Sequence, residues 1–325
     1  MTESLRIEII TPAARGSRTG NRVTALRWAG MLRSLGATVR VVNEHRHSDC
    51  NLFIVLHARA SHGSIRAIKT RLPDRPLLVT LTGTDLYVDL DRNPETMESL
   101  RLADRILTLQ GKAAERLPED LRSRVVVVPQ SSRPPDHPRK RREECFEVLV
   151  VAHLREVKDP LLAARAAREL PDRSRIQIVH LGQALTPEME QAARAEQISN
   201  PRYRWLGSRP RRETLERLSA ARLLVQSSTS EGGANAVSEA IVCRTPVLCT
   251  RVDGTVGMLG VDYPGYFEVG DASGLARLLL RAETDPAYLS SLAAHCEALR
   301  PTYTPENERR IWARLLDELA ARSAF

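Results

Sequence analysis

Aromatic residues are scarce in this sequence, because Phe, Trp and Tyr together make up only 4% of its 325 residues. Proteins that bind single-stranded nucleic acid stack the bases on aromatic side chains within a basic groove. No basic run of this chain is interleaved with aromatic residues. The net charge of +8 indicates an anionic partner, and a small phosphorylated ligand explains its sign as well as nucleic acid does. We expect no nucleic-acid partner, and a basic nucleic-acid-binding protein stays as the non-enzyme alternative.

Long apolar runs are also absent. None approaches the ~20 residues that a helix needs to cross a bilayer. The first ten residues, MTESLRIEII, lack the basic and apolar regions of a signal peptide. We therefore expect a cytoplasmic protein without a membrane partner, and the sequence does not indicate its oligomeric state.

The five cysteines form no CxxC pair and no metal-ligand spacing, so neither a zinc site nor a disulfide framework is expected. Cys50, Cys243 and Cys249 adjoin apolar segments and are expected to be buried thiols. Asp89 and Asp91 form an Asp-x-Asp pattern that some enzymes use to bind a divalent cation, but this segment leads into a predicted helix. We expect no metal and no cofactor.

Apolar strands alternate with amphipathic helices in two successive series, which is typical of doubly wound parallel sheets. The strands expected in the first series span residues 5–11, 37–42, 49–58, 76–85, 103–110 and 123–131. Those expected in the second series span residues 146–153, 174–182, 203–207, 221–228 and 245–252. The sequence thus predicts an α/β protein with two Rossmann-like domains that face each other across a cleft, where ligands bind at the carboxyl ends of the strands.

A segment rich in proline and basic residues, 133–145, separates the two series and is expected to be a linker. It divides the chain into an N-terminal Rossmann-like domain, 1–132, and a C-terminal Rossmann-like domain, 146–304. Residues 305–325 are predicted to form a terminal helix that can cross back to the first domain.

The stretch QSSTSEGGANAVSEAIVC, residues 226–243, carries the strongest functional pattern. It follows an apolar strand and opens a helix, so the backbone N–H groups of Gly232, Gly233 and Ala234 can bind a phosphate. Two acids, Glu231 and Glu239, bracket this turn, and carboxylates accept strong hydrogen bonds from sugar hydroxyls. Phosphate and hydroxyl groups together indicate a sugar nucleotide. An ordinary helix start with a solvated Glu239 is the alternative.

The segment HLREVKDP places two cations, Arg155 and Lys158, after the first strand of the second domain. Basic residues at the start of a helix oppose its dipole, so a role in binding a diphosphate is favoured over a structural one. His153 can reach the phosphate or the sugar, and Trp205 ends a strand where a nucleotide base can bind. Residues 253–267 are expected to form a loop that folds over this ligand.

Three strand ends of the first domain carry polar and basic side chains. They are GSRTGNRVT, HAR and TGTD, and their content suits a small oxyanion better than a neutral sugar. The candidate acceptor-binding residues are Arg18, Asn21, Arg22, Thr24, His57, Arg59, Thr82, Thr84 and Asp85.

Two such domains, with Arg155 and Lys158 after a strand and with Glu231 and Glu239 separated by seven residues, resemble the GT-B glycosyltransferases of family 4. The resemblance implies that the two cations bind the donor diphosphate, that Glu231 meets the donor sugar and that Glu239 binds ribose. It also implies that the amides of residues 232–235 hold phosphate. The donor-binding candidates are then Gly20, His153, Arg155, Lys158, Trp205, Ser228, Glu231, Gly232, Gly233, Ala234, Asn235 and Glu239.

A narrower likeness covers most of the chain. It rests on the segments TPAARGSRTGNRVTALRW, LHARAS, LTGTDLY, HLREVKDP, NPRYRWLG, SEGGANAVSEAI and GMLGVDYPGYF, which are similar to the selenosugar synthase family of selenoneine biosynthesis. That family transfers the sugar of UDP-N-acetylglucosamine to selenophosphate and releases UDP and phosphate. The catalytic candidates are then Lys158, Arg155, Glu231, Thr24 and Asn21. The nearest alternative is a conventional UDP-sugar glycosyltransferase with a hydroxyl acceptor, for which we would expect an apolar acceptor groove.

Overall fold

The computed structural model describes residues 5–17 and 19–322, and the described chain forms two compact units. The N-terminal unit contains the chain up to Gln130, the short segment Glu231–Gly233, and the chain from Glu306 onward. The C-terminal unit contains Ser131–Ser230 and Ala234–Pro305. Residues 128–145 contain neither helix nor strand.

The N-terminal unit is built on a six-stranded parallel sheet with the strand order β2-β1-β3-β4-β5-β6. Its strands are short apolar runs, as expected where helices cover both faces of a parallel sheet. They are β1 Arg6–Ile10, β2 Thr38–Val42, β3 Leu52–Leu56, β4 Leu77–Thr80, β5 Arg105–Thr108 and β6 Val125–Val127. The order reverses between β1 and β3, so the loops after these two strands lie at the topological switch point, where such sheets bind ligands.

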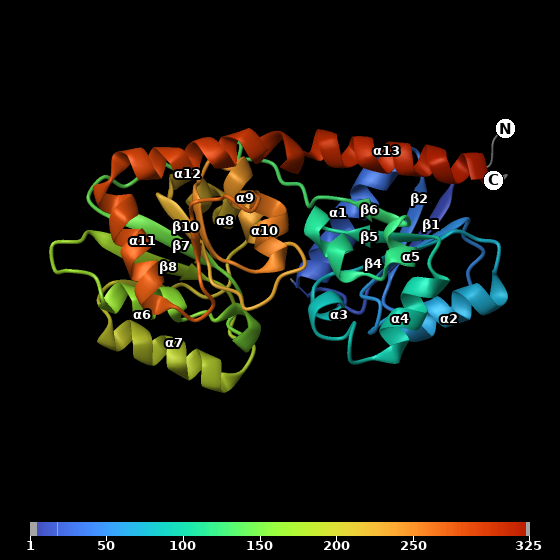
Figure 1. Ribbon diagram of the computed structural model, residues 1–325, viewed down its shortest axis with the longest axis horizontal. Helices are drawn as coiled ribbons and strands as arrows, with labels where there is room; N and C mark the ends of the chain where they lie inside the picture. The colour runs from blue at the N-terminus through green and yellow to red at the C-terminus, as the bar shows by residue number, and fades with distance from the viewer. Residues whose placement is uncertain (1–4, 18, 323–325) are drawn as a thin grey trace. The chain divides into compact units, whose positions relative to one another are not determined.

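Helices cover both faces of this sheet (Figure 1). Ile7 and Ile9 of β1 pack toward α1 and α13, and Ile10 packs on the other face with residues of α2 and α4. The helices are α1 Gly20–Ser34, α2 His62–Arg71, α3 Thr84–Tyr87, α4 Pro94–Leu102, α5 Glu119–Arg122 and α13 Pro305–Arg322, with a 3-10 helix η1 at Gly111–Arg116.

The last helix, α13, packs on α1 through buried aromatic rings. The ring centroids of Trp28 and Trp312 lie 5.1 Å apart in an edge-on arrangement. Trp28 Nε1 donates to Glu308 Oε1 over 2.7 Å, and the Nε of Arg27 lies 3.2 Å from Glu308 Oε2. The Glu308 carboxylate is fully buried, so these donors supply the hydrogen bonds that such a group needs. The C-terminal helix is therefore part of the N-terminal core.

The C-terminal unit has a second six-stranded parallel sheet, in the order β12-β11-β10-β7-β8-β9. Its strands are β7 Phe146–Val151, β8 Ile176–Leu181, β9 Tyr203–Trp205, β10 Leu223–Gln226, β11 Val247–Thr250 and β12 Tyr266–Phe267. The chain passes from β7 to β8 and β9 on one side and returns through β10 on the other, so the switch point lies between β7 and β10.

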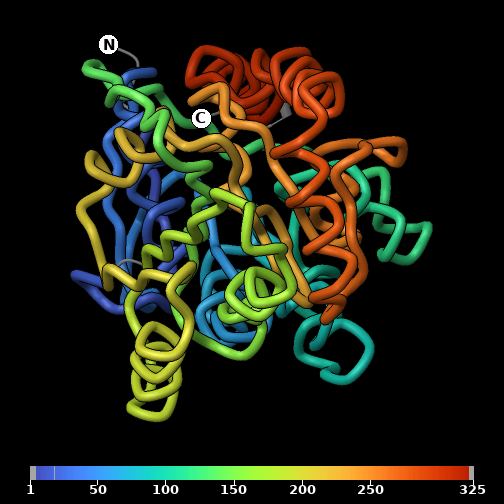
Figure 2. The backbone as a smooth tube through the Cα atoms, turned by 90° about the vertical axis from the view of Figure 1, so that its left-hand side faces the viewer, coloured from blue at the N-terminus to red at the C-terminus, as the bar shows by residue number. Residues whose placement is uncertain are grey.

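The helix Pro286–Leu299 of this unit begins with a favourable capping residue. Asp285 accepts from the N–H groups of Ala287 and Tyr288 and precedes Pro286, a preferred first helical residue. This helix, α12, was not expected from the sequence, although Asp-Pro is a signal for a helix start. It follows α11 in the chain, and both are drawn in orange to red in Figures 1 and 2. The helices are α6 Leu162–Arg168, α7 Pro187–Ser199, α8 Arg211–Ala220, α9 Asn235–Val242, α10 Asp253–Leu259, α11 Ala272–Thr284 and α12 Pro286–Leu299, with 3-10 helices η2 Glu156–Lys158 and η3 Arg300–Tyr303.

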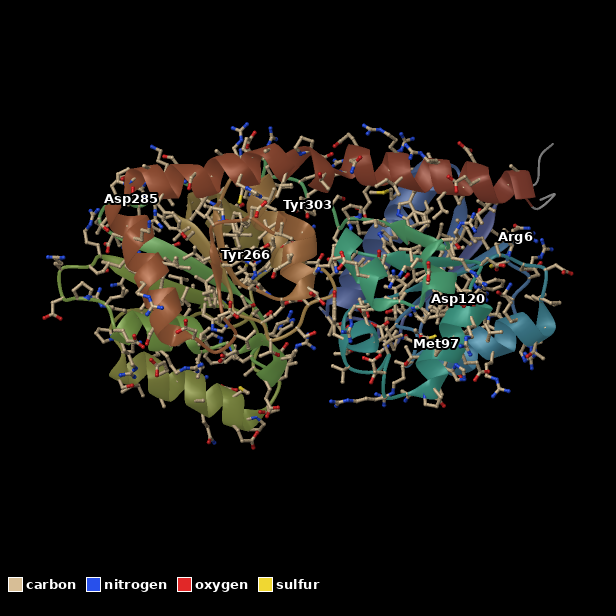
Figure 3. The ribbon with its side chains drawn as sticks, viewed as in Figure 1. Arg6, Met97, Asp120, Tyr266, Asp285 and Tyr303 are labelled. Carbon is tan, nitrogen blue, oxygen red and sulfur yellow. The ribbon has the colours of Figure 1, made fainter. Side chains whose placement is uncertain are left out.

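The expectation of a loop over residues 253–267 is wrong, because this segment forms α10 and β12. Thr255 Oγ1 donates to Thr250 O over 2.6 Å, which fixes α10 to the end of β11. Tyr303 OH donates to Met258 O, and Tyr266 OH donates to Gly260 O; both tyrosines are labelled in Figure 3. The tyrosines thus anchor the segment to its own unit.

The predicted fold class, an α/β protein with two doubly wound parallel sheets, is confirmed. Cys50, Cys243 and Cys249 are buried free thiols, as predicted. In the described part of the chain, no helix is long and apolar enough to span a bilayer.

Replacing Trp312 tests the contribution of α13. We expect Trp312→Ala to lower the free energy of unfolding of the N-terminal unit by about 3–5 kcal/mol, because it removes a fully buried aromatic side chain. Urea denaturation can be followed by tryptophan fluorescence in a Trp205→Phe background, in which every remaining tryptophan lies in the N-terminal unit. Arg310→Ala, at an exposed position of the same helix, is the matched control. Equal urea midpoints for the two variants would contradict the assignment of α13 to this core.

Candidate active site

The loops after β7 and β10 are tied together at the switch point of the C-terminal unit. Ser227 Oγ donates to Lys158 O and to Asp159 O, over 3.0 and 2.9 Å. The backbone N–H of Thr229 donates to Val157 O over 2.9 Å. The loop that follows one strand therefore fixes the turn that follows the other.

Arg155 and Lys158, the two cations predicted to bind the diphosphate, lie on this turn. Arg155 is the extended residue before η2, its side chain is exposed, and Lys158 ends η2. Asp159 then adopts a left-handed conformation with φ of 35°, which separates η2 from α6. The helix α6 thus begins only at Leu162. Non-glycine residues rarely adopt this conformation, and those that do cluster at active and ligand-binding sites.

The end of β7 is held by buried groups of β8 and β9. The His180 ring lies between Tyr203 OH and Ala152 O, with both contacts at 2.9 Å. Gly182 approaches the same carbonyl so closely that a β-carbon there would lie 1.7 Å from Ala152 O. Position 182 therefore requires glycine, because any side chain there would collide with the backbone that follows β7. His153, which follows Ala152, accepts a hydrogen bond at Nδ1 from the backbone N–H of Gln183 over 3.2 Å.

Trp205 ends β9, as predicted, but its ring already has partners. Its Nε1 donates to Gly182 O over 2.8 Å, and the guanidinium carbon of Arg194 lies 5.6 Å from the ring centroid. The ring therefore supports the strand ends. Ser228 is fully buried, and its hydroxyl accepts from Gln226 Nε2 over 2.8 Å.

The glycine turn has a packing role. The segment Glu231–Gly233 belongs to the N-terminal unit, and a β-carbon on Gly232 would lie 2.4 Å from Thr82 O. A β-carbon on Gly233 would lie 2.6 Å from the β-carbon of Leu109. Both positions therefore require glycine, whatever ligand the turn binds.

The remaining residues of this motif open α9. Ala234 N donates to the Met258 sulfur over 3.2 Å, so one of the amides expected to hold phosphate already has a protein partner. Asn235 is the first residue of α9. Ala234 and Asn235 belong to the C-terminal unit, whereas the glycine turn belongs to the N-terminal unit.

Glu239, the predicted ribose ligand, has a partner that the sequence did not indicate. Arg211, the first residue of α8, donates to Glu239 Oε1 through Nε and Nη2, over 3.1 and 2.9 Å. These two residues are far apart in the sequence, and no spacing rule connects them.

In the N-terminal unit, Asp85 organises the strand ends. It is fully buried and accepts from the backbone N–H groups of Ala58, Thr82 and Gly83, over 3.0, 2.8 and 2.9 Å. The carboxylate therefore joins the loop after β3 to the loop after β4. Such an arrangement positions its neighbours, and it leaves the Asp85 carboxylate engaged with backbone.

His57 lies on the first of these loops in a left-handed conformation, with φ of 71°. Ala60 N donates to its Nδ1 over 3.3 Å, so the neutral ring carries its proton on Nε2, which lies 3.0 Å from Thr84 Oγ1. The two predicted residues are thus in contact. Arg59 points to a different partner, Asp89 Oδ1, at 2.8 Å.

The first turn of α1 carries a third group of predicted residues and contains no acid. Thr24 Oγ1 accepts from Gln130 Nε2 over 2.7 Å. The Arg22 side chain lies in the same turn, and the residue is only 9% exposed. Its Nε and the Oε1 of Gln130 are buried and have no hydrogen-bond partner among residues 5–17 and 19–322. Unpaired buried polar atoms are costly, so this is where a polar ligand would be stabilised.

Two other candidates begin this helix. Gly20 and Asn21 are the first residues of α1, and Arg18 lies outside the described residues. Elsewhere, Asp89 and Asp91 of the Asp-x-Asp pattern pair with Arg59 and Arg116. Within the described ranges, no group of His, Cys, Asp or Glu side chains could hold a metal ion.

The fold is shared with several solved structures. The chain matches HepE of Anabaena, solved with UDP, with a TM-score of 0.75 at 14% identity, over 96% of this chain and 99% of that one. It matches the sucrose-phosphate synthase of Thermosynechococcus elongatus with a TM-score of 0.76 at 17% identity, over 98% and 100% of the two chains. A third match is the UDP-forming trehalose-phosphate synthase of Burkholderia xenovorans, solved with glucose-6-phosphate, at a TM-score of 0.73 and 10% identity, over 97% and 99%.

The two parallel sheets therefore define a protein of the GT-B fold. Residues 132–298, just over half of the chain, match the family model described as glycosyl transferases group 1. The chain belongs to this family. The prediction of a GT-B glycosyltransferase is confirmed.

The buried His180 makes stability depend on pH. Burial lowers the pKa of its imidazole to about 4, from 6.5 for the ordinary group. Between these values the unfolded chain binds a proton that the folded chain does not, so the free energy of unfolding falls as the pH falls through this window. The effect is at most roughly 3 kcal/mol, since each pKa unit corresponds to about 1.4 kcal/mol.

We expect His180→Gln to weaken this dependence, because glutamine can keep the bond to Ala152 O and does not titrate. Urea denaturation at pH 4.5 and pH 7 would measure it, with His137→Gln at an exposed position as control. The same loss of stability on acidification in His180→Gln and in the wild type would show that the dependence arises elsewhere.

Proposed function

We propose that this glycosyltransferase transfers the sugar of UDP-N-acetylglucosamine to selenophosphate, forming a 1-selenosugar for selenoneine biosynthesis. The proposal starts from the seven segments that are similar to selenosugar synthases. It assigns the diphosphate of the donor to the switch point of the C-terminal unit and the acceptor to the strand ends of the N-terminal unit.

Donor binding is supported by the switch point between β7 and β10. Arg155 and Lys158 follow β7 on a turn that Ser227 and Thr229 hold in place. Both cations would bind the diphosphate and stabilise the charge that develops on it as it departs. HepE, of the same fold, is solved with UDP-glucose, which supports a uridine diphosphate donor here.

The other donor residues keep the roles that the family resemblance implies. Glu231 would meet the donor sugar, and Glu239 the ribose hydroxyls. His153 and Trp205 lie at the ends of β7 and β9, where the nucleotide would bind. The proposed contributors of backbone or small polar groups are Gly20, Ser228, Gly232, Gly233, Ala234 and Asn235.

One observation carries the acceptor proposal: Arg22 is nine-tenths buried, and its buried Nε is unpaired within the described part of the chain. A small oxyanion would satisfy it. The first turn of α1 would add the side chains of Asn21 and Thr24, and an anion is favoured at a helix start without acids. The further acceptor candidates are Arg18, His57, Arg59, Thr82 and Thr84, positioned in part by Asp85.

The reaction follows from these contacts. Selenium attacks the anomeric carbon, the bond to the diphosphate oxygen breaks, and UDP departs with the electron pair. Water then cleaves the Se–P bond and releases phosphate and the selenosugar. A selenium anion is a strong nucleophile, so the protein mainly positions the reactants and stabilises the leaving group.

A second candidate is a conventional transferase whose hydroxyl acceptor carries a phosphate. The same unpaired Nε of Arg22 favours it, because a sugar phosphate also presents an oxyanion. The trehalose-phosphate synthase of the same fold is solved with such a ligand, glucose-6-phosphate.

Product analysis separates the two candidates. The purified protein is incubated with UDP-N-acetylglucosamine and either selenophosphate, thiophosphate or glucose-6-phosphate, and the products are identified by mass spectrometry. We expect UDP, phosphate and an N-acetylhexosamine selenol or its diselenide with selenophosphate. A disaccharide phosphate formed only with glucose-6-phosphate would support the second candidate instead.

Arg22→Met tests the acceptor pocket. Methionine fills a similar volume without the charge, so we expect the KM for selenophosphate to rise about 10–100-fold, the usual range for a lost hydrogen bond to a charged group. The KM for UDP-N-acetylglucosamine should change little. Arg15→Met, at an exposed position of the preceding loop, is the control. Unchanged acceptor kinetics in a folded Arg22→Met protein would rule out this pocket.

A further inference from the structure

The contact between Arg211 and Glu239 is one-sided. Both guanidinium donors of Arg211 reach the same oxygen, Oε1. The other oxygen, Oε2, accepts no hydrogen bond from any residue that the structure describes. The Glu239 side chain is 12% exposed, so its carboxylate is mostly removed from water and depends on few partners.

Arg211 has a second hydrogen-bond partner, Ser132, whose own backbone is held in place. Its Nη2 also donates to Ser132 Oγ over 2.9 Å. Ser132 is almost fully buried, and its N–H donates to Tyr303 O over 3.0 Å. The guanidinium is therefore held from two sides, although half of its side chain is exposed.

The helices that carry the two residues are also fixed to each other. Thr245, which follows α9, donates through Oγ1 to Leu218 O of α8 over 2.5 Å, and Cys243 Sγ lies 3.7 Å from Leu215 O. A movement of the Glu239 carboxylate relative to Arg211 would need a rotation of its side chain. The bonds to Oε1 oppose that rotation.

We propose that Arg211 is a positioning residue for nucleotide recognition: it holds Oε1 of Glu239 and thereby directs Oε2 toward the ribose hydroxyls of the UDP donor. The inference rests on the proposed function, because it takes the ligand of Glu239 to be ribose. Arg211 also balances the charge of a carboxylate that lies in a largely dry environment. Lysine would supply charge but not two donors of fixed geometry.

Nucleotide binding without the second substrate tests this role. Isothermal calorimetry with UDP and with 2′,3′-dideoxyuridine diphosphate gives the ratio of the two dissociation constants for each variant. In the wild type we expect UDP to bind roughly tenfold or more tightly than the dideoxy analogue, since a charged acceptor is lost from both ribose hydroxyls. Glu239→Gln should reduce this ratio.

Arg211→Met should reduce the ratio toward one, and Arg211→Lys should restore part of it. Arg212→Met is the matched control, because Arg212 is the next residue of α8, is mostly exposed and pairs only with Glu216 of the same helix in the described structure. Thermal unfolding of each variant separates folding from recognition, since a purely structural role would lower the melting temperature and leave the ratio unchanged.

The outcomes distinguish the inference from the proposed function. A wild-type ratio that persists in Arg211→Met would overturn the inference and leave the UDP-dependent function standing. Failure of the wild-type protein to bind UDP would overturn the function and the inference with it. A ratio that falls in Arg211→Met and recovers in Arg211→Lys would support both.

Discussion

Hydrogen bonds from Ser227 and Thr229 to the backbone carbonyls of the turn after β7 are the interaction on which the candidate donor site depends. A turn of three residues that ends in a left-handed aspartate has little stability of its own. The loop after β10 supplies the missing partners. Because β7 and β10 are adjacent parallel strands, these two loops meet only at the switch point of the sheet.

The N-terminal unit reaches a similar result by a different device. A single buried carboxylate, Asp85, accepts three backbone N–H groups from two loops. A carboxylate can accept several hydrogen bonds at once, so it can satisfy the N–H groups of loops that have no partner in a helix or a sheet. In both units, hydrogen bonds to backbone groups fix the loops that carry the candidate site residues.

The sheets could be predicted from the sequence because fully buried parallel strands are short apolar runs, such as LFIVL at β3. The helices α10 and α12 could not, since tertiary contacts of Thr255 and an unrecognised Asp-Pro cap decide them. The residues of the candidate site could be listed from their positions after strands. Their partners could not: Arg211 lies in another helix from Glu239, and the engagement of Asp85 by backbone depends on three-dimensional proximity alone.

The packing of α13 on α1 has a consequence for biosynthesis. A ribosome releases the N-terminal sheet first, yet Trp28 and the buried Glu308 can meet only after residue 308 has been translated. Domains generally fold as units during synthesis, beginning with the first one made. The second sheet can therefore finish folding on the nascent chain while the first-made core still lacks α13, which leaves part of its apolar surface uncovered.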